Sequence, residues 1–187
     1  MAIASLLIAN RGEIAVRIIR AARLLGIRTV QAHSAADADS LAVRMADEAV
    51  LIGPPPAAKS YLDIEAVMKA ARETGVDAVH PGYGFLAENA DFADAVVSAG
   101  MIFVGPDASA IRLLGDKVAA RKVAREAGVP TVPGSEGRIA GIEEARALVE
   151  EIGFPVMIKA AAGGGGRGIR IVRDFDEFEK QFPQAAS

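Results

Sequence analysis

The chain has 187 residues, of which 51% are hydrophobic and 24% are charged, a composition typical of a globular protein and not of a disordered one. Its 21 Lys and Arg residues against 24 Asp and Glu give a net charge of −3, which argues against an electrostatic nucleic-acid binder. The absence of cysteine excludes disulfides, zinc thiolates and a cysteine nucleophile.

The N-terminal segment does not have the pattern of a signal peptide. It lacks a basic region, and its apolar run is interrupted at Asn10 and Arg11. No apolar segment of the sequence is long enough to cross a bilayer. We therefore expect a soluble, cytoplasmic protein with no membrane partner.

Strand-like and helical patterns alternate through the first part of the chain. Short apolar or β-branched runs predict strands at residues 5–9, 29–33, 49–52, 78–80 and 102–104. Amphipathic stretches between them predict helices at residues 13–25, 39–46, 63–74 and 91–99. Repeated β-α-β order with short connections predicts an α/β fold, a doubly wound, Rossmann-like parallel sheet with helices on both faces.

A connecting segment follows this sheet. Asp116 is a candidate N-cap for a helix that ends at Gly128. Residues 129–137 contain two prolines and two glycines, which predicts a linker.

The last part of the chain predicts a smaller unit. The patterns predict a helix at residues 142–152, strands at 155–159 and 169–173, and an acidic helix from about residue 174. Pro183 is expected to break this last helix. Two strands and parts of two helices are too few to close a sheet, so they predict only part of a domain.

A glycine-rich loop joins the last two predicted strands. Gly163, Gly165 and Gly168 match the spacing G-x-G-x-x-G, but a dinucleotide site requires a helix directly after the glycines. No G-K-[ST] follows, so the loop is not a P-loop. Its bare backbone N–H groups instead favour a flap over a polyphosphate. The alternative is a surface hairpin without such a role.

Two lysines are candidate phosphate ligands. Lys159 ends an otherwise apolar strand beside the glycines, a position from which a cation can meet phosphate oxygens. Lys117 lies in the first turn of its helix, where the helix macrodipole disfavours a cation, and a broken local rule often marks a functional site. For both residues the alternative is an ordinary solvated lysine.

The loops after the first and fourth predicted strands are a second candidate site. Ligands of open parallel sheets bind beyond the carboxyl ends of the strands. In HPGYGFLAEN (residues 80–89), Gly82 and Gly84 permit a tight turn, and Tyr83 offers an aromatic face with a hydroxyl. The alternative is a rigid structural loop in which backbone groups satisfy His80. ANRGE (residues 9–13) has one glycine where a dinucleotide site needs three, which argues against a nicotinamide cofactor.

Six segments, in this order, closely resemble the start of biotin carboxylase, the ATP-grasp component of acetyl-, propionyl- and methylcrotonyl-CoA carboxylases and of pyruvate carboxylase. They are IANRGEIAVRIIRAARLLGIRTV, ADEAVLIGPPPAAKSYLDIEAV, HPGYGFLAENADFA, FVGPDASAIRLLGDKVAAR, AGVPTVPGS and FPVMIKAAAGGGGRGIRIV. The resemblance runs over essentially the whole chain. It implies a pre-ATP-grasp sheet domain at residues 1–115, a connecting helix and linker at 116–134, and an incomplete ATP-grasp lid subdomain at 135–187.

The resemblance also implies a reaction and its participants. ATP activates bicarbonate as carboxyphosphate, and the CO2 that this releases is captured by N1′ of biotin on a carrier protein. A separate carboxyltransferase then uses the carboxylated biotin, and Mg²⁺ accompanies ATP. The family's ATP-phosphate residues match Lys117, Lys159, Gly163, Gly164, Gly165, Gly166 and Gly168, and its biotin-ring loop matches Tyr83 and Gly84.

The chain departs from the family pattern at several positions. Ala161 and Ala162 replace a Ser-Gly pair of some members, and Leu24 replaces an acidic dimer-contact residue whose basic partner, Arg20, is kept. Homodimerisation is therefore left open. The family's magnesium-binding glutamates, its bicarbonate and biotin arginines, its general base and its adenine-binding hinge correspond to positions after residue 187. We expect no catalytic or metal-ligand residue within these 187 residues and no turnover by them alone.

Two other functions fit the sequence less well. One is a short non-catalytic module that binds nucleotide or a carboxylase subunit. The other is a different ATP-grasp ligase related to carbamoyl-phosphate synthase, against which HPGYGFLAEN and ANRGEIA argue.

Overall fold

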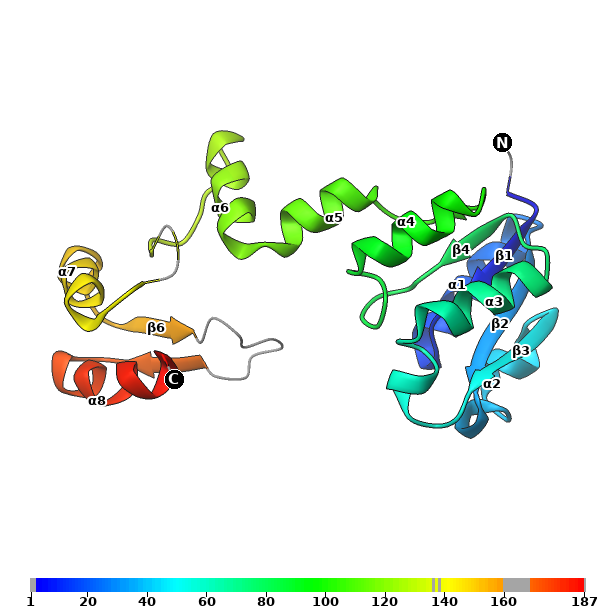
Figure 1. The fold of residues 1–187 in the computed structure, drawn as a ribbon, viewed down its shortest axis with the longest axis horizontal. Helices are drawn as coiled ribbons and strands as arrows, with labels where there is room; N and C mark the ends of the chain where they lie inside the picture. Colours follow the sequence, from blue (N-terminus) through cyan, green and yellow to red (C-terminus); the bar gives the residue numbers. More distant parts are fainter. Residues whose placement is uncertain (1–2, 136, 138, 160–168, 187) are drawn as a thin grey trace. The chain divides into compact units, whose positions relative to one another are not determined.

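The chain divides into two units, Met1–Asp116 and Lys117–Ser187. The computed structural model describes residues 3–135, 137, 139–159 and 169–186, without the side chains of residues 117 and 184–186 (Figure 1). Each unit is described by itself.

A five-stranded parallel sheet forms the centre of the first unit. Its strands are β1 (Ser5–Ile8), β2 (Arg28–Ser34), β3 (Glu48–Gly53), β4 (Ala78–His80) and β5 (Ile102–Phe103). They lie side by side in the order β3-β2-β1-β4-β5, and each pairs with its neighbour in parallel. This arrangement confirms the predicted doubly wound sheet.

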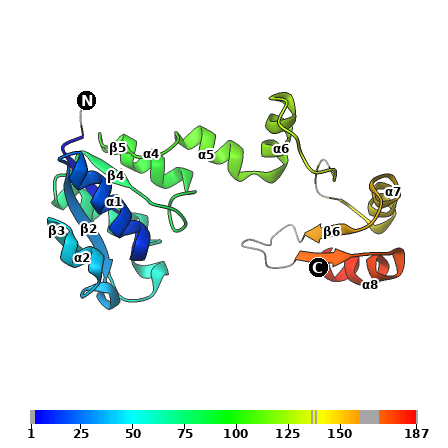
Figure 2. The same ribbon diagram turned by 180° about the vertical axis from the view of Figure 1, so that it is seen from behind.

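Helices cover both faces of this sheet, as Figures 1 and 2 show from opposite sides. α1 (Gly12–Leu24) and α2 (Leu41–Met45) pack on one face, and α3 (Ile64–Glu73) and α4 (Ala90–Ser98) pack on the other. Adjacent residues of β1 accordingly enter different cores, with Leu6 and Ile8 facing α1 and Leu7 facing α3 and α4. A strand covered on both sides has no reason to alternate polar and apolar residues, and every residue of β1 is buried.

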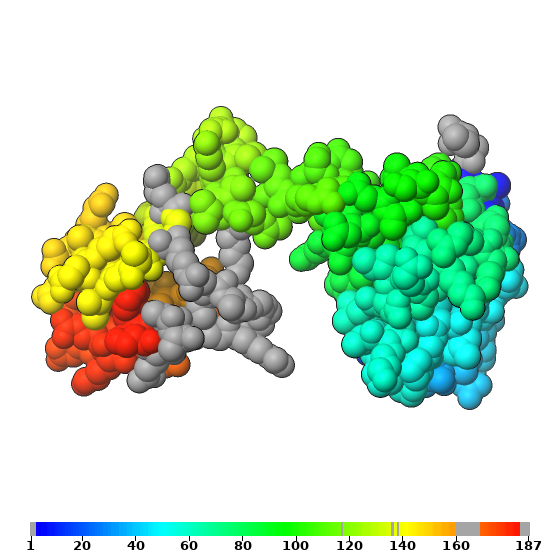
Figure 3. All heavy atoms as spheres, viewed as in Figure 1, coloured from blue at the N-terminus to red at the C-terminus, as the bar shows by residue number. Residues whose placement is uncertain are grey.

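The connections contain short elements that the periodicity did not predict. Two 3₁₀ turns, Ala35–Asp37 and Ala57–Lys59, follow β2 and β3. A further helix, α5 (Ala108–Gly115), begins after Asp107, whose carboxylate accepts a hydrogen bond from the Ala110 N–H. In the space-filling view, cyan, teal and green atoms from the second half of the first unit form most of the side that faces the viewer (Figure 3).

The second unit is a β-hairpin with helices on one face. Its elements are α6 (Lys117–Glu126), α7 (Ile142–Ile152), β6 (Val156–Lys159), β7 (Ile169–Val172) and α8 (Phe175–Ala186). β6 and β7 are antiparallel, and the core against the helices consists of Ala145, Val149, Val172 and Phe178. The expectation that Pro183 breaks the last helix is wrong, since α8 continues to Ala186. Pro183 cannot donate a helical hydrogen bond, but three further residues continue α8 after it.

The predicted linker is not free of the helix before it. The Arg121 guanidinium of α6 donates to the carbonyl of Ser135 at 2.7 Å and to that of Val132 at 2.9 Å. These bonds tie residues 132–135 to α6, and the division between the two units falls before Lys117.

Candidate functional site

The carboxyl ends of β1 and β4 form the topological switch point of the sheet. From β1 the chain continues through α1 to β2 on one side, and it returns through α3 to β4 on the other side. The Ala9 N–H donates to the His80 carbonyl at 3.0 Å, which keeps the two strands together up to the point where their loops begin. Loops that diverge from such a point leave a crevice, the usual ligand position in this fold class.

Asn10 joins the two loops. Its side chain is buried, and its amide nitrogen donates to the carbonyls of Pro81 at 2.7 Å and Tyr83 at 2.9 Å. The contact leaves no room for a side chain at Gly82, where a Cβ would lie 2.6 Å from the Asn10 amide nitrogen. The sequence did not reveal Asn10, because its partners lie more than 70 positions away and no spacing rule connects them.

Tyr83 and Gly84 lie at the tip of the loop after β4. The Tyr83 side chain is 60% exposed, and its hydroxyl donates to the Glu13 carboxylate in the first turn of α1, which raises the pKa of Tyr83. Gly84 has φ +65°, and a Cβ there would meet nothing within 4 Å, so glycine serves the backbone conformation. The neighbouring His80 accepts a hydrogen bond from the Gly82 N–H at 3.0 Å, and burial lowers the pKa of His80. A neutral, backbone-bonded imidazole fits a structural role.

The Arg11 side chain closes the other end of the same loop. Its guanidinium carbon lies 5.6 Å from the centre of the Tyr61 ring and 5.7 Å from that of Phe85, and the two rings are stacked with their centres 5.1 Å apart. The Arg11 guanidinium also lies 3.7 Å from the Asp37 carboxylate. Burial by itself would raise the pKa of Asp37, but hydrogen bonds from Ser34 and Tyr61 and the charge of Arg11 outweigh burial and hold this pKa below its ordinary value.

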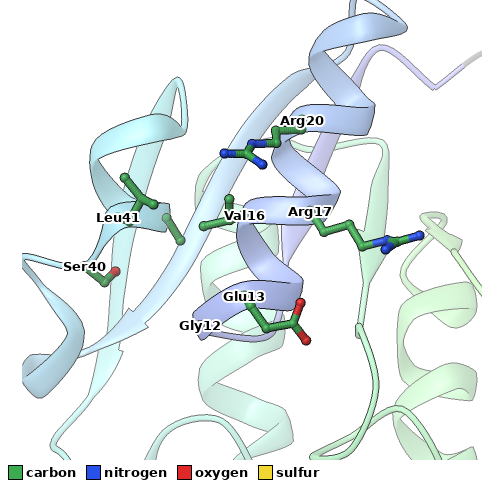
Figure 4. Close-up of a pocket in the computed structure, with 8 residues that line it drawn as sticks. Gly12, Glu13, Val16, Arg17, Arg20, Ser40 and Leu41 are labelled. Carbon is green, nitrogen blue, oxygen red and sulfur yellow. The ribbon is translucent and has the colours of Figure 1, made fainter.

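A surface groove of about 570 Å³ lies between α1 and α2. Arg17, Arg20, Ser40 and Leu41 are among its lining residues, and in Figure 4 Arg20 extends from α1 to the side of Leu41, whereas Arg17 extends away from it. Leu24, on the last turn of α1, is 89% exposed. Arg20, the basic residue of the family's dimer contact, and Leu24, which replaces its acidic partner, therefore both lie on the accessible surface of α1.

The hairpin of the second unit presents an exposed apolar face. Met157 pairs with Ile171 and Lys159 pairs with Ile169, so these four side chains project from one side of the hairpin. Met157, Ile169 and Ile171 are 42% to 53% exposed, because α7 and α8 cover the opposite side. The sequence drew attention to Lys159 but not to these three neighbours.

The other predicted phosphate ligands are only partly within the structure. Lys117 is the first residue of α6, and the position of its side chain is not described. Gly163, Gly164, Gly165, Gly166 and Gly168 lie outside the described residues. No group of three or more His, Cys, Asp or Glu among residues 3–135, 137, 139–159 and 169–186 could hold a metal ion.

Residues 2–111 match the family model of the biotin carboxylase N-terminal domain. The chain belongs to this family. The match confirms the resemblance seen in the sequence motifs. Residues 116–187 match a second model, the ATP-binding domain of the carbamoyl-phosphate synthase L chain.

Known biotin carboxylases resemble the chain along almost all of its length. Biotin carboxylase of Pseudomonas aeruginosa is 58% identical over 175 residues, which are 93% of this chain and 39% of that protein. Biotin carboxylase of Campylobacter jejuni, solved as a β,γ-ATP complex, has a TM-score of 0.91 at 45% identity over 98% of this chain and 41% of that one.

A third relative is the biotin carboxylase domain dimer of 2-oxoglutarate carboxylase from Hydrogenobacter thermophilus, solved with MgADP, ADP and bicarbonate. It has a TM-score of 0.90 at 48% identity over 99% of this chain and 41% of that one. The chain thus spans about two fifths of the length of these biotin carboxylases.

No helix among the described residues is long and apolar enough to cross a membrane.

Proposed function

We propose that the chain supplies the N-terminal portion of a biotin carboxylase. In the proposed reaction, bicarbonate attacks the terminal phosphorus of ATP to give carboxyphosphate and ADP. Carboxyphosphate then breaks down to CO2 and phosphate, and deprotonated N1′ of biotin on a carrier protein attacks CO2. The carrier protein and a carboxyltransferase are the proposed partners, together with a second copy of the chain.

The observation that carries this proposal is the exposed face of the β6–β7 hairpin. Met157 and Lys159 are two residues apart on β6, a spacing of about 7 Å along a strand. A nucleotide presents a flat, largely apolar base and an anionic polyphosphate, which need different surroundings. The aliphatic side chains of Met157, Ile169 and Ile171 fit the base, and the ammonium group of Lys159 fits the phosphates.

The remaining assignments extend this site. We assign Lys117 as a second phosphate cation and Gly163 to Gly168 as a lid that covers the triphosphate and excludes water from carboxyphosphate. Tyr83 and Gly84 are assigned to the biotin ring. Mg²⁺ would neutralise charge on the phosphates when it is bound. We assign its ligands to the rest of the enzyme, where the family resemblance places the magnesium-binding glutamates.

The domain boundaries are part of the same proposal. We assign residues 1–115 to the sheet domain, 116–134 to a connector and 135–187 to the lid subdomain. The structure separates into two compact units between Asp116 and Lys117, which supports the first boundary.

The experiment is steady-state ADP release by the longest polypeptide of the source that contains this sequence, with ATP, bicarbonate and free biotin. Lys159→Gln should lower kcat/KM for ATP by roughly 10²- to 10³-fold, because a cation aimed at the transferring phosphoryl group is lost. Lys180→Gln is the matched control, since it removes the same charge from an exposed position on α8 of the same unit. The control should stay within about twofold of the wild type.

Two results would contradict the proposal. A wild-type polypeptide without biotin-dependent ADP release would refute the assigned reaction. A Lys159→Gln variant as active as Lys180→Gln would refute the hairpin as the ATP site.

A further inference from the structure

Asn10 uses its whole side-chain amide to hold the loop that carries Tyr83. The amide nitrogen donates both hydrogens, to the carbonyls of Pro81 and Tyr83, and the amide oxygen accepts from the Arg11 N–H at 2.9 Å. The side chain is only 3% exposed, so water cannot replace these partners. Among side chains of this length, only the carboxamide supplies two donors and one acceptor.

The anchor itself is rigid. The Asn10 carbonyl accepts a hydrogen bond from the buried Gln31 side chain at 2.7 Å, and the preceding Ala9 bonds to β4. Asn10 therefore cannot follow the loop if the loop moves, because its own backbone is fixed to both neighbouring strands.

The loop is shaped to this anchor. Gly82 has φ +68°, and its missing Cβ would lie within 3.0 Å of three atoms of the Asn10 side chain. A glycine at this position serves two needs at once, a left-handed backbone and direct contact with the amide. The contact and the two hydrogen bonds fix the backbone on both sides of Gly82.

The far end of the loop is fixed by a second group. Phe85 has φ +43°, uncommon for a residue with a side chain, and its ring is stacked on Tyr61 beside the Arg11 guanidinium. Tyr83 lies between these two fixed points and is nevertheless 60% exposed. A loop held at both ends, with one aromatic residue projecting, is suited to present that residue to a ligand.

We propose that Asn10 is a positioning residue for biotin: its amide sets the backbone of the loop that presents Tyr83 and Gly84 to the biotin ring. This role rests on the proposed function. Without the amide, two carbonyls lose their donor and Gly82 loses its support, so the loop shifts against the sheet. Binding of biotin should weaken, whereas binding of ATP, assigned to the hairpin, should not change.

The test compares Asn10→Ala and Asn10→Asp with the wild type in the longest polypeptide that contains this sequence. We expect KM for free biotin to rise by roughly ten- to hundredfold at saturating ATP and bicarbonate, with KM for ATP unchanged. Asn10→Asp retains the volume and the acceptor but supplies at most one donor in place of two, so it should resemble Asn10→Ala. Asn89→Ala is the matched control, because the Asn89 carboxamide accepts from the Phe92 N–H at 2.9 Å as the cap of α4, at the helix end of the segment and four residues beyond Phe85.

A second measurement separates positioning from general destabilisation. Amide hydrogen exchange of the same polypeptide should become faster at residues 82–85 in Asn10→Ala, while exchange in β1 and β4 stays near that of Asn89→Ala. Equal acceleration throughout the sheet would make Asn10 an ordinary core residue and overturn the inference.

The kinetic outcomes distinguish this inference from the proposed function. If the wild type releases ADP in response to biotin but Asn10→Ala has an unaltered KM for biotin, the positioning role alone is overturned. If the wild type shows no response to biotin, the proposed function fails and the role of Asn10 toward biotin fails with it.

Discussion

Removal of the Tyr61 hydroxyl should destabilise the first unit without changing its packing. Tyr61 is 1% exposed, and its hydroxyl donates to the Asp37 carboxylate at 2.8 Å and accepts from the Ser34 N–H at 3.0 Å. Burial and the nearby Asp37 charge together raise the pKa of Tyr61 to about 12, so the hydroxyl stays protonated and remains a donor at neutral pH. Tyr61→Phe keeps the ring against Phe85 and Arg11 and removes only these two bonds.

The expected loss follows from the partner groups. The Ser34 N–H is fully buried and would have no acceptor, which costs about 1–3 kcal/mol, and a hydrogen bond to a charged group contributes about 1.5–3 kcal/mol. The two terms overlap because one hydroxyl makes both bonds. We therefore expect Tyr61→Phe to lower the free energy of unfolding of this unit by about 2–3 kcal/mol at pH 7.

Amide exchange at Leu7 and Val30 measures this free energy, because both lie in the core of the first unit. Tyr83→Phe is the control: it removes the hydroxyl of the chain's second tyrosine, which is exposed, and should change stability by less than about 0.5 kcal/mol. The difference in the free energy of unfolding between Tyr61→Phe and the wild type should become smaller as the pH falls through the lowered pKa of Asp37. Protonation removes the negative charge that strengthens the hydrogen bond from the Tyr61 hydroxyl. Equal effects of the two substitutions would refute the account.

Two further predictions concern pH and backbone geometry. Because burial lowers the pKa of His80, the stability that neutral His80 contributes is present above about pH 6.5 and is lost as the pH falls through the folded-state pKa. His80→Asn keeps an acceptor for the Gly82 N–H, so its free energy of unfolding in urea should fall less than that of the wild type between pH 7.5 and 5. Identical pH profiles of the two proteins would contradict this prediction. A Cβ on Gly53 would lie 2.1 Å from the Lys59 carbonyl oxygen, so Gly53→Ala should lower the free energy of unfolding by roughly 2–4 kcal/mol. Gly75 has a positive φ but no such contact, so Gly75→Ala should lower it by only about 1–2 kcal/mol. Equal losses of the two variants in urea unfolding would contradict this prediction, because they would mean that the structure around Gly53 relaxes freely.

The sheet could be predicted because its determinants are local. Apolar runs such as residues 5–9 are separated by amphipathic stretches of helical length, and short connections leave few alternatives to a parallel sheet. α5 was missed although Asp107 is an ordinary N-cap, because the segment has only eight residues and directly precedes a second helix. The expectation at Pro183 failed because a proline makes a helix less favourable at its position without always ending it.

The candidate sites could be located but not assembled from the sequence. The loops after β1 and β4 are predictable as a ligand edge from topology alone. The bonds from Asn10 to Pro81 and Tyr83 depend on the two strands being neighbours and on their register, Ile8 beside His80, which no local pattern contains. Likewise, period-two alternation groups Met157 with Lys159, but only the packing of α7 and α8 on the opposite side determines that this group is exposed.

The two candidate sites differ in what holds them, and this difference bears on how each would respond to its ligand. The loop with Tyr83 is fixed by buried hydrogen bonds and by stacked rings, so its geometry is established before any ligand arrives. The hairpin face has the opposite character, since Met157, Ile169 and Ile171 leave apolar surface in water. Covering such surface gains about 25 cal/mol for each Å², so an aromatic base that settles on it is favoured by burial alone. We therefore expect Tyr83 to contribute to selectivity and the hairpin face to contribute to affinity.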